Sequence, residues 1–326
     1  FNEEYRLKES GAILNWFDNT DPDMTNVIPA RIKYFGSKLF SNTKLVRVSF
    51  EYSDESISLS TAFDGCAELS MVNLGSRKMI VSVGAFKNCA SLGSISIGSG
   101  ATSIGKNAFQ GCVNLTEVSL PTDGALTKVA DGVFTNMANL QTVSFTGVGG
   151  TLTSIDNNAF KGTGITEIEI PEGVTSIGKY AFQNCASLTK ISLPASLTSI
   201  GEDAIDGCDK LSSIDVAADN ENFSFNDGAF YVETRVDETK VEVTLAMVLP
   251  SRPQGPFVVP ERVTSIAGYA FADTSVSEVR FMNADTKLEN YAFANAAKLE
   301  KVMLPANLTE ISEGAFTNSG LKEIVI

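Results

Sequence analysis

The sequence predicts an α/β-type repeat solenoid, a curved rod in which each coil of the chain contributes one short parallel strand. Two observations predict this fold class. An Ala-Phe pair, or a close variant, returns at intervals of 22 to 26 residues between Phe40 and Ile205, and a β-prone run of the form Leu-x-x-Ile-x-Leu-Pro follows it. A coil of this length cannot bury its own apolar face, so neighbouring coils must stack on one another.

Each coil is expected to contain the same parts. The Phe fills the core, and the segment that follows it forms a turn or a short helix. The runs at 115–120, 188–193 and 299–304 alternate with period two near their ends and stop before a proline, which predicts short strands. The pairs stand at Leu39-Phe40, Ala62-Phe63, Ala85-Phe86, Ala108-Phe109, Val133-Phe134, Ala159-Phe160, Ala181-Phe182, Ala204-Ile205, Ala270-Phe271, Ala292-Phe293 and Ala315-Phe316.

Two segments interrupt the repeat and divide the chain. Residues 1–36 precede the first clear coil and are expected to form the N-terminal cap that such stacks need. Between Phe230 and Phe271 the spacing rises to 41 residues, and this interval contains two β-prone segments joined by a polar one, which predicts an inserted hairpin. The expected organisation is a cap at 1–36, repeats at 37–216, a degenerate coil with the inserted β-hairpin at 217–261, and repeats at 262–326.

Composition excludes several classes of function. The chain has 326 residues, a net charge of 25 − 39 = −14 and no histidine. So negative a chain is a poor partner for nucleic acid. The absence of histidine removes Ser-His-Asp and Cys-His relays and the usual zinc sites, and we expect no cofactor. No run of about 18 apolar residues occurs, so we expect no membrane insertion of this segment.

The five cysteines share one position, three residues after the repeat Phe or its Ile variant. Met137, Thr163, Thr274, Ala296 and Ser319 take the same position in other coils, and these side chains have modest size in common. A disulfide framework and a metal ladder are the alternatives to a packing position. Side chains of stacked coils run parallel, which suits a disulfide poorly, so five free and inert thiols are expected. They are Cys66, Cys89, Cys112, Cys185 and Cys208.

The segment Thr-Ser-Ile-Gly-Lys-Tyr-Ala-Phe-Gln-Asn-Cys-Ala-Ser-Leu-Thr-Lys-Ile-Ser-Leu-Pro, at 175–194, resembles the consensus of the BspA-type leucine-rich repeat. The resemblance covers about residues 36–326 and recurs some eleven times. The sequence departs from the consensus at a few positions. Ser58 stands where the repeat has an apolar residue, Ile205 stands where it has Phe, and the proline is missing after Leu74 and Ile97. The resemblance implies a leucine-rich repeat rod from a secreted or surface-attached bacterial protein, often a lipoprotein. Characterised relatives adhere to host matrix proteins or to other bacteria, and the family shares no catalytic residues.

Residues that flank the central apolar position of each strand point away from the core and form the concave face of the rod. In the middle coils this face is hydroxylic and acidic, which suits a basic or glycan-like ligand. A solvated face without a ligand is the alternative, since binding hot spots favour Trp, Tyr and Arg. The candidate binding residues on the face are Glu117, Ser119, Thr142, Glu167, Glu169, Lys190 and Asp215.

The inserted hairpin is a second candidate binding element, because insertions in repeat arrays often bind. Its candidate residues are Tyr231, Glu233 and Arg235. The alternative is a spacer that covers a seam between two sub-arrays.

Other candidate chemistry is weaker. Asp18, Asp21 and Asp23, and the segment 219–222, supply oxygen ligands for calcium, yet they lack the spacing of an EF-hand, and no metal site is expected. Glu167 and Glu169 form the best carboxylate pair for glycoside hydrolysis, about 7 Å apart on one strand. An open face of small residues offers no deep pocket, so we expect that the chain is not an enzyme.

These expectations favour an adhesin-type binding scaffold at the cell surface or outside the cell, on the bacterial outer surface. It would recognise an extracellular protein or glycan through its concave face and hairpin. A structural spacer or assembly component of a surface complex is the alternative, and a carboxylate-based glycosidase is a remote one. We expect a monomer; the C-terminal strand at 321–326 leaves a parallel edge, and pairing of this edge with another molecule stays open.

Overall fold

The computed structural model describes residues 26–147 and 149–326. Most of the expected cap, residues 1–25, therefore lies outside the described residues, as do Asp18, Asp21 and Asp23. Contacts divide the chain into two compact units. The first unit contains the residues up to 188 together with 199–208, and the second contains 189–198 together with 209–326.

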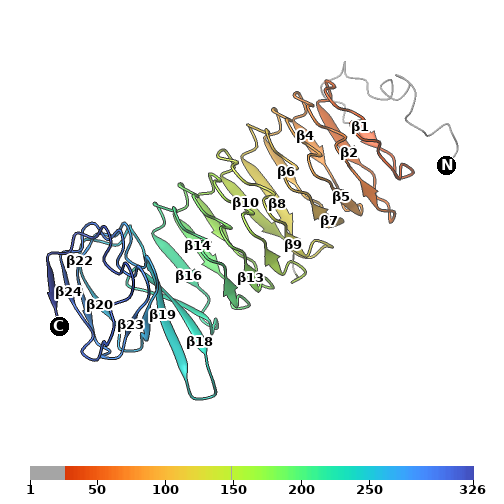
Figure 1. Ribbon diagram of the computed structural model, residues 1–326. Coiled ribbons are helices and arrows are strands. Elements are labelled where there is room, and N and C mark those ends of the chain that lie inside the picture. Colours follow the sequence, from red (N-terminus) through yellow and green to blue (C-terminus); the bar gives the residue numbers. More distant parts are fainter. Residues whose placement is uncertain (1–25, 148) are drawn as a thin grey trace. The chain divides into compact units, whose positions relative to one another are not determined.

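The first unit is a stack of coils with one long parallel sheet along one side (Figure 1). Neighbouring strands in this sheet come from successive coils, as the repeat predicts. In order, they are β1 (Asn26–Ile28), β2 (Arg47–Phe50), β4 (Met71–Asn73), β6 (Ser94–Ser96), β8 (Glu117–Pro121), β10 (Thr142–Thr146) and β12 (Glu167–Glu169).

Most coils also contain a second short strand, which the sequence did not predict. These strands lie at the apolar residue five positions before the repeat Phe, and most contain only two residues. A strand this short shows no readable alternation, which explains the miss. One group is β3 (Ile57–Ser58), β5 (Met79–Val81) and β7 (Ala101–Ile104); the other is β9 (Lys128–Val129), β11 (Ser154–Ile155), β13 (Ser176–Ile177) and β15 (Ser199–Ile200).

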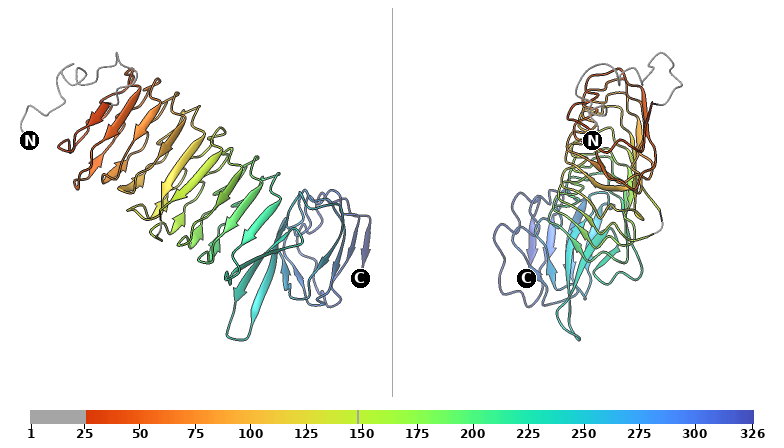
Figure 2. Two further views of the ribbon diagram at one scale, coloured as in Figure 1. Left: turned by 180° about the vertical axis from the view of Figure 1, so that it is seen from behind. Right: turned by 90° about the vertical axis from the view of Figure 1, so that its right-hand side faces the viewer.

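The second unit combines parallel coils with antiparallel strands. β17 (Phe223–Asn226), β18 (Ala229–Arg235) and β19 (Val241–Val248) pair antiparallel, and the β18–β19 hairpin extends away from the coils of its unit (Figure 2). β19 then pairs in parallel with β21 (Ser265–Ile266), so the hairpin is continuous with the following coils. The other strands are β14 (Lys190–Leu193), β16 (Ser213–Val216), β20 (Gly255–Val259), β22 (Val276–Phe281), β23 (Lys287–Leu288), β24 (Lys301–Met303) and β25 (Glu323–Val325).

The repeat phenylalanines form a column in the core of each unit. In the first unit the rings from Phe40 to Phe182 stack face to face, with centroids 5.2 to 5.8 Å apart in successive coils. In the second unit Phe271, Phe293 and Phe316 continue the pattern. Ring stacking adds to the burial of large apolar side chains. The predicted core position of the Phe is confirmed.

The segment after each Phe is a turn, and the described residues contain no helix. The residue two positions after the Phe takes a left-handed conformation, with φ of 58° at Asn42, 77° at Gly65, 59° at Asn88 and 80° at Gly111. Asn and Gly tolerate this conformation, which prevents the turn from continuing as a helix. In the first unit Asn and Gly alternate at this position from Asn42 to Gly207, and the Asn side chain occupies the space that a Cβ on the Gly of the next coil would need.

All five cysteines are free and buried, as predicted. Each thiol donates a hydrogen bond to the carbonyl of the repeat Phe in the preceding coil, for example Cys66 Sγ to Phe40 O at 2.9 Å and Cys112 Sγ to Phe86 O at 3.0 Å. Hydroxyls at this position can donate to the Phe carbonyl of their own coil, such as Thr274 Oγ1 to Phe271 O at 2.9 Å. Small donors are therefore common at this position, although Met137 and Ala296 show that a donor is not required.

Candidate functional site

The outward side chains of four strands in the first unit form a continuous surface, which we call the ladder face. The register places Thr142 of β10 between Glu117 of β8 and Glu167 of β12. Val118, Val143 and Ile168, the central residues of these strands, are buried, so their neighbours point outward. The ladder face consists of Ser94, Ser96, Glu117, Ser119, Thr142, Ser144, Glu167 and Glu169.

The carboxylates of the ladder face have no cation of their own. Among the described residues, no ion pair or hydrogen bond joins Glu117, Glu167 or Glu169 to another side chain. Each is exposed. The ladder face therefore presents three acidic side chains that no cation of the described residues pairs with.

Strands of the second unit differ, because their outward carboxylates each pair with a cation. Asp215 Oδ2 lies 2.6 Å from Lys190 Nζ, and Glu323 Oε1 lies 2.7 Å from Lys301 Nζ. Glu278 likewise pairs with Arg280 at 2.9 Å. The hydrogen bond from Lys190 lowers the pKa of the Asp215 carboxyl below its usual range.

The predicted face residues therefore fall into two groups. Glu117, Ser119, Thr142, Glu167 and Glu169 lie together on the first unit. Lys190 and Asp215 lie on the second unit and bind each other, so a ligand must compete with or share their ion pair.

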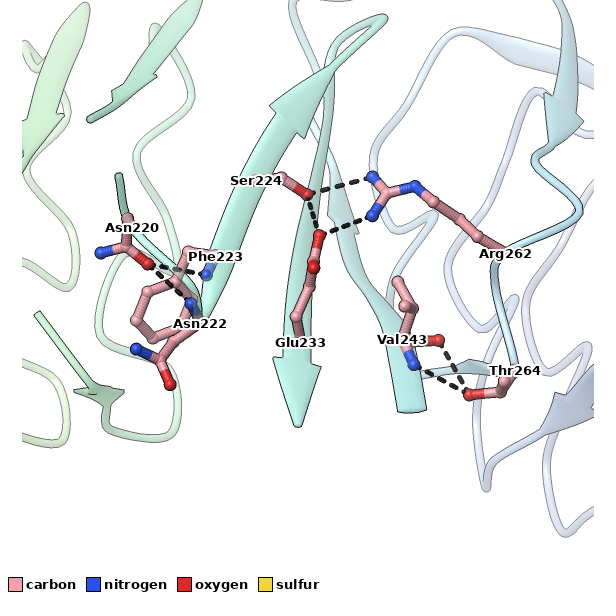
Figure 3. Close-up of polar contacts among 8 residues, drawn as sticks. All are labelled: Asn220, Asn222, Phe223, Ser224, Glu233, Val243, Arg262 and Thr264. Atoms are coloured by element: carbon pink, nitrogen blue, oxygen red, sulfur yellow. Dashed lines mark hydrogen bonds and ion pairs between the residues drawn. The ribbon is translucent and has the colours of Figure 1, made fainter. Parts of the chain in front are cut away.

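The base of the hairpin is held by a cluster around Arg262 (Figure 3). Arg262 Nη1 lies 2.6 Å from Glu233 Oε1, and its Nη2 donates to Ser224 Oγ at 3.0 Å. Ser224 donates to the same Glu233 oxygen at 2.8 Å, which closes a triangle of contacts between β17, β18 and the coil at 260–266. The Arg262 guanidinium also lies over the Tyr231 ring, 4.6 Å from its centroid.

Thr264 makes a second link at the hairpin base (Figure 3). Its hydroxyl accepts a hydrogen bond from Val243 N at 3.0 Å and donates one to Val243 O at 3.1 Å. The Thr264 side chain thus pairs with the backbone N–H and C=O groups of Val243, next to the residue where the parallel pairing of β19 with β21 begins. Because backbone polar groups are costly to leave unpaired, this contact stabilises the hairpin at the point where it leaves the coils.

The three predicted hairpin residues therefore have different surroundings. Tyr231 is buried, with 1% of its surface exposed, and burial raises the pKa of its hydroxyl to about 12. Glu233 is engaged by Arg262 and Ser224. Arg235 is exposed near the hairpin tip, where the exposed residues Val236 and Val241 also lie. Sequence reasoning missed Arg262, whose partners lie 29 to 38 residues earlier with no repeat signal to connect them.

The segment 219–222 serves the backbone. Asn220 Oδ1 accepts hydrogen bonds from the N–H groups of Asn222 and Phe223, both at 2.9 Å (Figure 3). Its Nδ2 donates to the carbonyls of Pro194 and Leu197. In the described part of the chain, no three His, Cys, Asp or Glu residues gather closely enough to hold a metal ion. Residues 26–147 and 149–326 also contain no helix that could span a lipid bilayer.

A repeated coil with stacked Phe residues, parallel strands and an outward strand face defines a leucine-rich repeat solenoid. Residues 33–152, 153–248 and 256–326 match the BspA type leucine rich repeat region in six copies, so the chain belongs to this family. No curated protein sequence matches the chain significantly.

Two solved structures show the same fold. A leucine-rich repeat protein from Eubacterium ventriosum is 24% identical, with a TM-score of 0.56 over 68% of this chain. The match covers 56% of that protein, so the chain spans a little over half of it. The pneumococcal vaccine antigen PcpA is 19% identical, with a TM-score of 0.52 over 82% of this chain and 67% of that one. At these identities the likeness concerns the fold alone.

Proposed function

We propose that this chain is an adhesin-type binding scaffold on the outer surface of a bacterium, and that its ladder face recognises a basic segment of an extracellular protein. The observation that carries the proposal is the set of three exposed carboxylates, Glu117, Glu167 and Glu169, that lack a cation, while the outward carboxylates of the second unit have one. The family supports a surface location and a binding role, since BspA-type repeats are typically non-enzymatic scaffolds.

The geometry suits a ligand that lies across several strands. Ser119 and Ser144 lie side by side in register, as do Glu117 and Thr142, so hydroxyl and carboxylate oxygens follow one another from coil to coil. A chain of lysine, arginine and amide groups complements such a surface. Each exposed charge contact contributes only about 0.2–1 kcal/mol, so affinity must come from several contacts and from many copies on one cell.

The hairpin supplies a further contact in this proposal. Arg262 and Thr264 hold its base, which leaves Arg235, Val236 and Val241 exposed on a positioned tip. A rigid element loses less conformational entropy on binding than a mobile loop. A glycan ligand is the alternative on the ladder face, where the hydroxyl groups of Ser94, Ser96 and Thr142 would act as its hydrogen-bonding partners.

The test measures how two triple variants of the full chain bind, at low salt, to arrays of extracellular-matrix proteins and glycans. In Glu117→Gln/Glu167→Gln/Glu169→Gln the ladder face loses its charge. The control, Glu68→Gln/Glu261→Gln/Glu310→Gln, changes three exposed carboxylates elsewhere, so both variants carry −14 + 3 = −11. We expect the ladder variant to lose about 3- to 30-fold in affinity for its protein ligand and the control to lose little.

Three results would contradict the proposal: binding of no array component above background, equal losses in the two variants, or binding confined to the glycan array. In the first case, cross-linking on the native cell that recovers a neighbouring envelope protein would favour the structural spacer. Binding confined to the glycan array would assign the ladder face to a carbohydrate.

A further inference from the structure

Tyr269 and Tyr291 form a stacked pair on the turns of the second unit, away from its outward strand positions. They occupy the same place in successive coils, two residues before Phe271 and Phe293. Their rings are parallel within 3°, with centroids 5.5 Å apart. Gly314 takes this place in the next coil, and a Cβ there would collide with the Tyr291 ring. The Tyr291 ring therefore lies between the backbone of Gly314 and the ring of Tyr269.

The backbone shows that this arrangement is imposed by the fold. Tyr269 and Tyr291 have φ angles of 60° and 63°, in the left-handed region that a bulky side chain seldom adopts. Several coils of the first unit have Gly84, Asn107 or Gly132 at the same place, residues that tolerate this conformation, although Lys38 and Tyr180 adopt it there too. A strained conformation persists only where its surroundings determine it, so the two rings are held in place before any ligand arrives.

Other tyrosines of this chain indicate what binds such a ring. Tyr180 stands at the same place in its coil, and Lys161 Nζ of the preceding coil lies 5.3 Å from its ring centroid. Tyr231 has the Arg262 guanidinium at 4.6 Å. Both contacts are cation–π interactions, in which the negative face of the ring attracts the cation.

Tyr269 lacks such a cation. Half of its surface is exposed (50%), and in the described part of the chain the Tyr291 ring is its one aromatic contact and no lysine or arginine lies over it. The coil that would supply an equivalent of Lys161 is replaced here by the β18–β19 hairpin.

Charge around the pair favours a cation as well. The Glu313 carboxylate lies 3.3 Å from the Tyr291 hydroxyl, and its negative charge raises the pKa of that hydroxyl. The chain as a whole carries −14. A carboxylate at the rim of the pair and a negative field around it both attract a positive group.

We infer that the exposed half of Tyr269 is a binding site for a cationic side chain, lysine or arginine, of a partner protein. Tyr291 stacks on the Tyr269 ring, and Glu313, which accepts a hydrogen bond from the Tyr291 hydroxyl, adds negative charge on the Tyr291 side of the pair. The site does not depend on the ladder face, since its residues all lie on turns of the second unit.

The test uses the full chain with ¹³C-labelled tyrosine rings, whose seven signals are assigned by substitution. Tetramethylammonium is the probe, because it binds aromatic faces and forms no hydrogen bonds; tert-butanol is the neutral control of similar shape. We expect the Tyr269 signal to shift saturably with tetramethylammonium and not with tert-butanol. The Tyr180 signal stays unchanged in the parent chain, where Lys161 covers the ring, and gains the response in Lys161→Ala.

A hexa-arginine peptide then tests the partner chemistry. In the background of the ladder triple variant, Tyr269→Leu should weaken peptide binding about two- to fivefold, Tyr269→Phe should retain it, and Tyr180→Leu should leave it unchanged. The inference is overturned if the Tyr269 signal ignores tetramethylammonium, if Tyr180→Leu costs as much as Tyr269→Leu, or if the ring responds to cellohexaose and not to the cation. Because the peptide experiment omits the ladder charges, failure here and failure of the ladder proposal are distinguishable.

Discussion

The guanidinium of Arg262 lies 4.6 Å from the ring centroid of Tyr231 while its Nη1 reaches Glu233 at 2.6 Å. One side chain thus contacts both an aromatic face and a carboxylate of strand β18, from a coil that begins about 30 residues later. A planar guanidinium makes both contacts at once, which a lysine ammonium cannot do equally well. Arg262 therefore connects the hairpin to the coils of the second unit.

Replacement of Arg262 by alanine should loosen the hairpin base. It leaves Glu233, a half-buried carboxylate, without its cation, and uncovers the Tyr231 ring; we expect a loss of about 1–2 kcal/mol in local stability. Hydrogen exchange of the β18 and β19 amides measures it. Arg262→Lys should recover part of the loss, and the exposed Arg235→Ala is the control with no effect. Unchanged exchange in Arg262→Ala would contradict the role.

Replacement of Phe134 by alanine should open a cavity in the column of rings. Phe134 is fully buried and stacks on Phe109 at 5.8 Å and on Phe160 at 5.3 Å. Removing a buried ring costs about 3–5 kcal/mol. Since each coil contacts only its neighbours, the loss should appear as faster hydrogen exchange in the coils around residue 134 and less in distant ones. The control variant Val83→Ala, at a site that is 61% exposed, should change the exchange rates little. An equal increase of exchange in all coils of Phe134→Ala would contradict the expectation that each coil depends mainly on its neighbours.

The Phe column and the order of the long sheet follow from the spacing of the Ala-Phe pairs, because each copy of the repeat reports on the same position. The second short strand does not follow, since Ser154 and Ile155 alone show no period. A contact that occurs once in the chain, and not in every coil, also leaves no signal in the sequence pattern. Arg262 and Glu233 belong to different kinds of element, and no spacing relates them.

The candidate site was predictable in part for the same reason. Alternation along β8 and β12 places Glu117 and Glu167 outward, and the structure agrees. Whether such a carboxylate has a cation depends on the diagonal reach of a long side chain. Lys190 stands in register with Ser213 and yet binds Asp215, two residues further on, a choice that the sequence pattern does not contain.

We expect that the five cysteine thiols do not react in the folded chain. All five thiols are buried, and burial raises the pKa of the Cys66 thiol. At pH 8 a thiol-specific disulfide reagent should therefore label none of the five cysteines in the native chain and all five in guanidinium. Rapid native labelling would contradict the packing role.

The raised pKa of the Cys66 thiol predicts that the folded chain loses stability at high pH. A folded-state pKa above the unfolded value, about 8.5 for a free thiol, means that the unfolded chain loses its proton first. The contribution of Cys66 is complete below pH 8.5 and falls as the pH rises toward the folded pKa. Cys66→Ala should remove this part of the alkaline decline, as measured by urea unfolding between pH 7 and 10.

The alternation of Asn and Gly on the turns predicts a coupled pair of substitutions. Gly111 has a φ of 80°, and a Cβ there would collide with Asn88 Oδ1 of the preceding coil. Gly111→Ala should therefore cost about 1 kcal/mol or more, from the left-handed backbone and from the collision together. Asn88→Ala in the same chain removes the collision and leaves the backbone cost, so the double variant should be more stable than the sum of the two single effects predicts.

Gly93 provides the matched control for this pair. Its φ is not positive, and a Cβ there would meet its nearest neighbour, Asn114 O, at 4.0 Å. Gly93→Ala should be neutral or slightly stabilising, because alanine lowers the entropy of the unfolded chain without a steric conflict. The measurement is a double-mutant cycle by urea unfolding. Additive effects of Gly111→Ala and Asn88→Ala would show that the left-handed backbone alone selects glycine, and that the alternation of Asn and Gly has no packing origin.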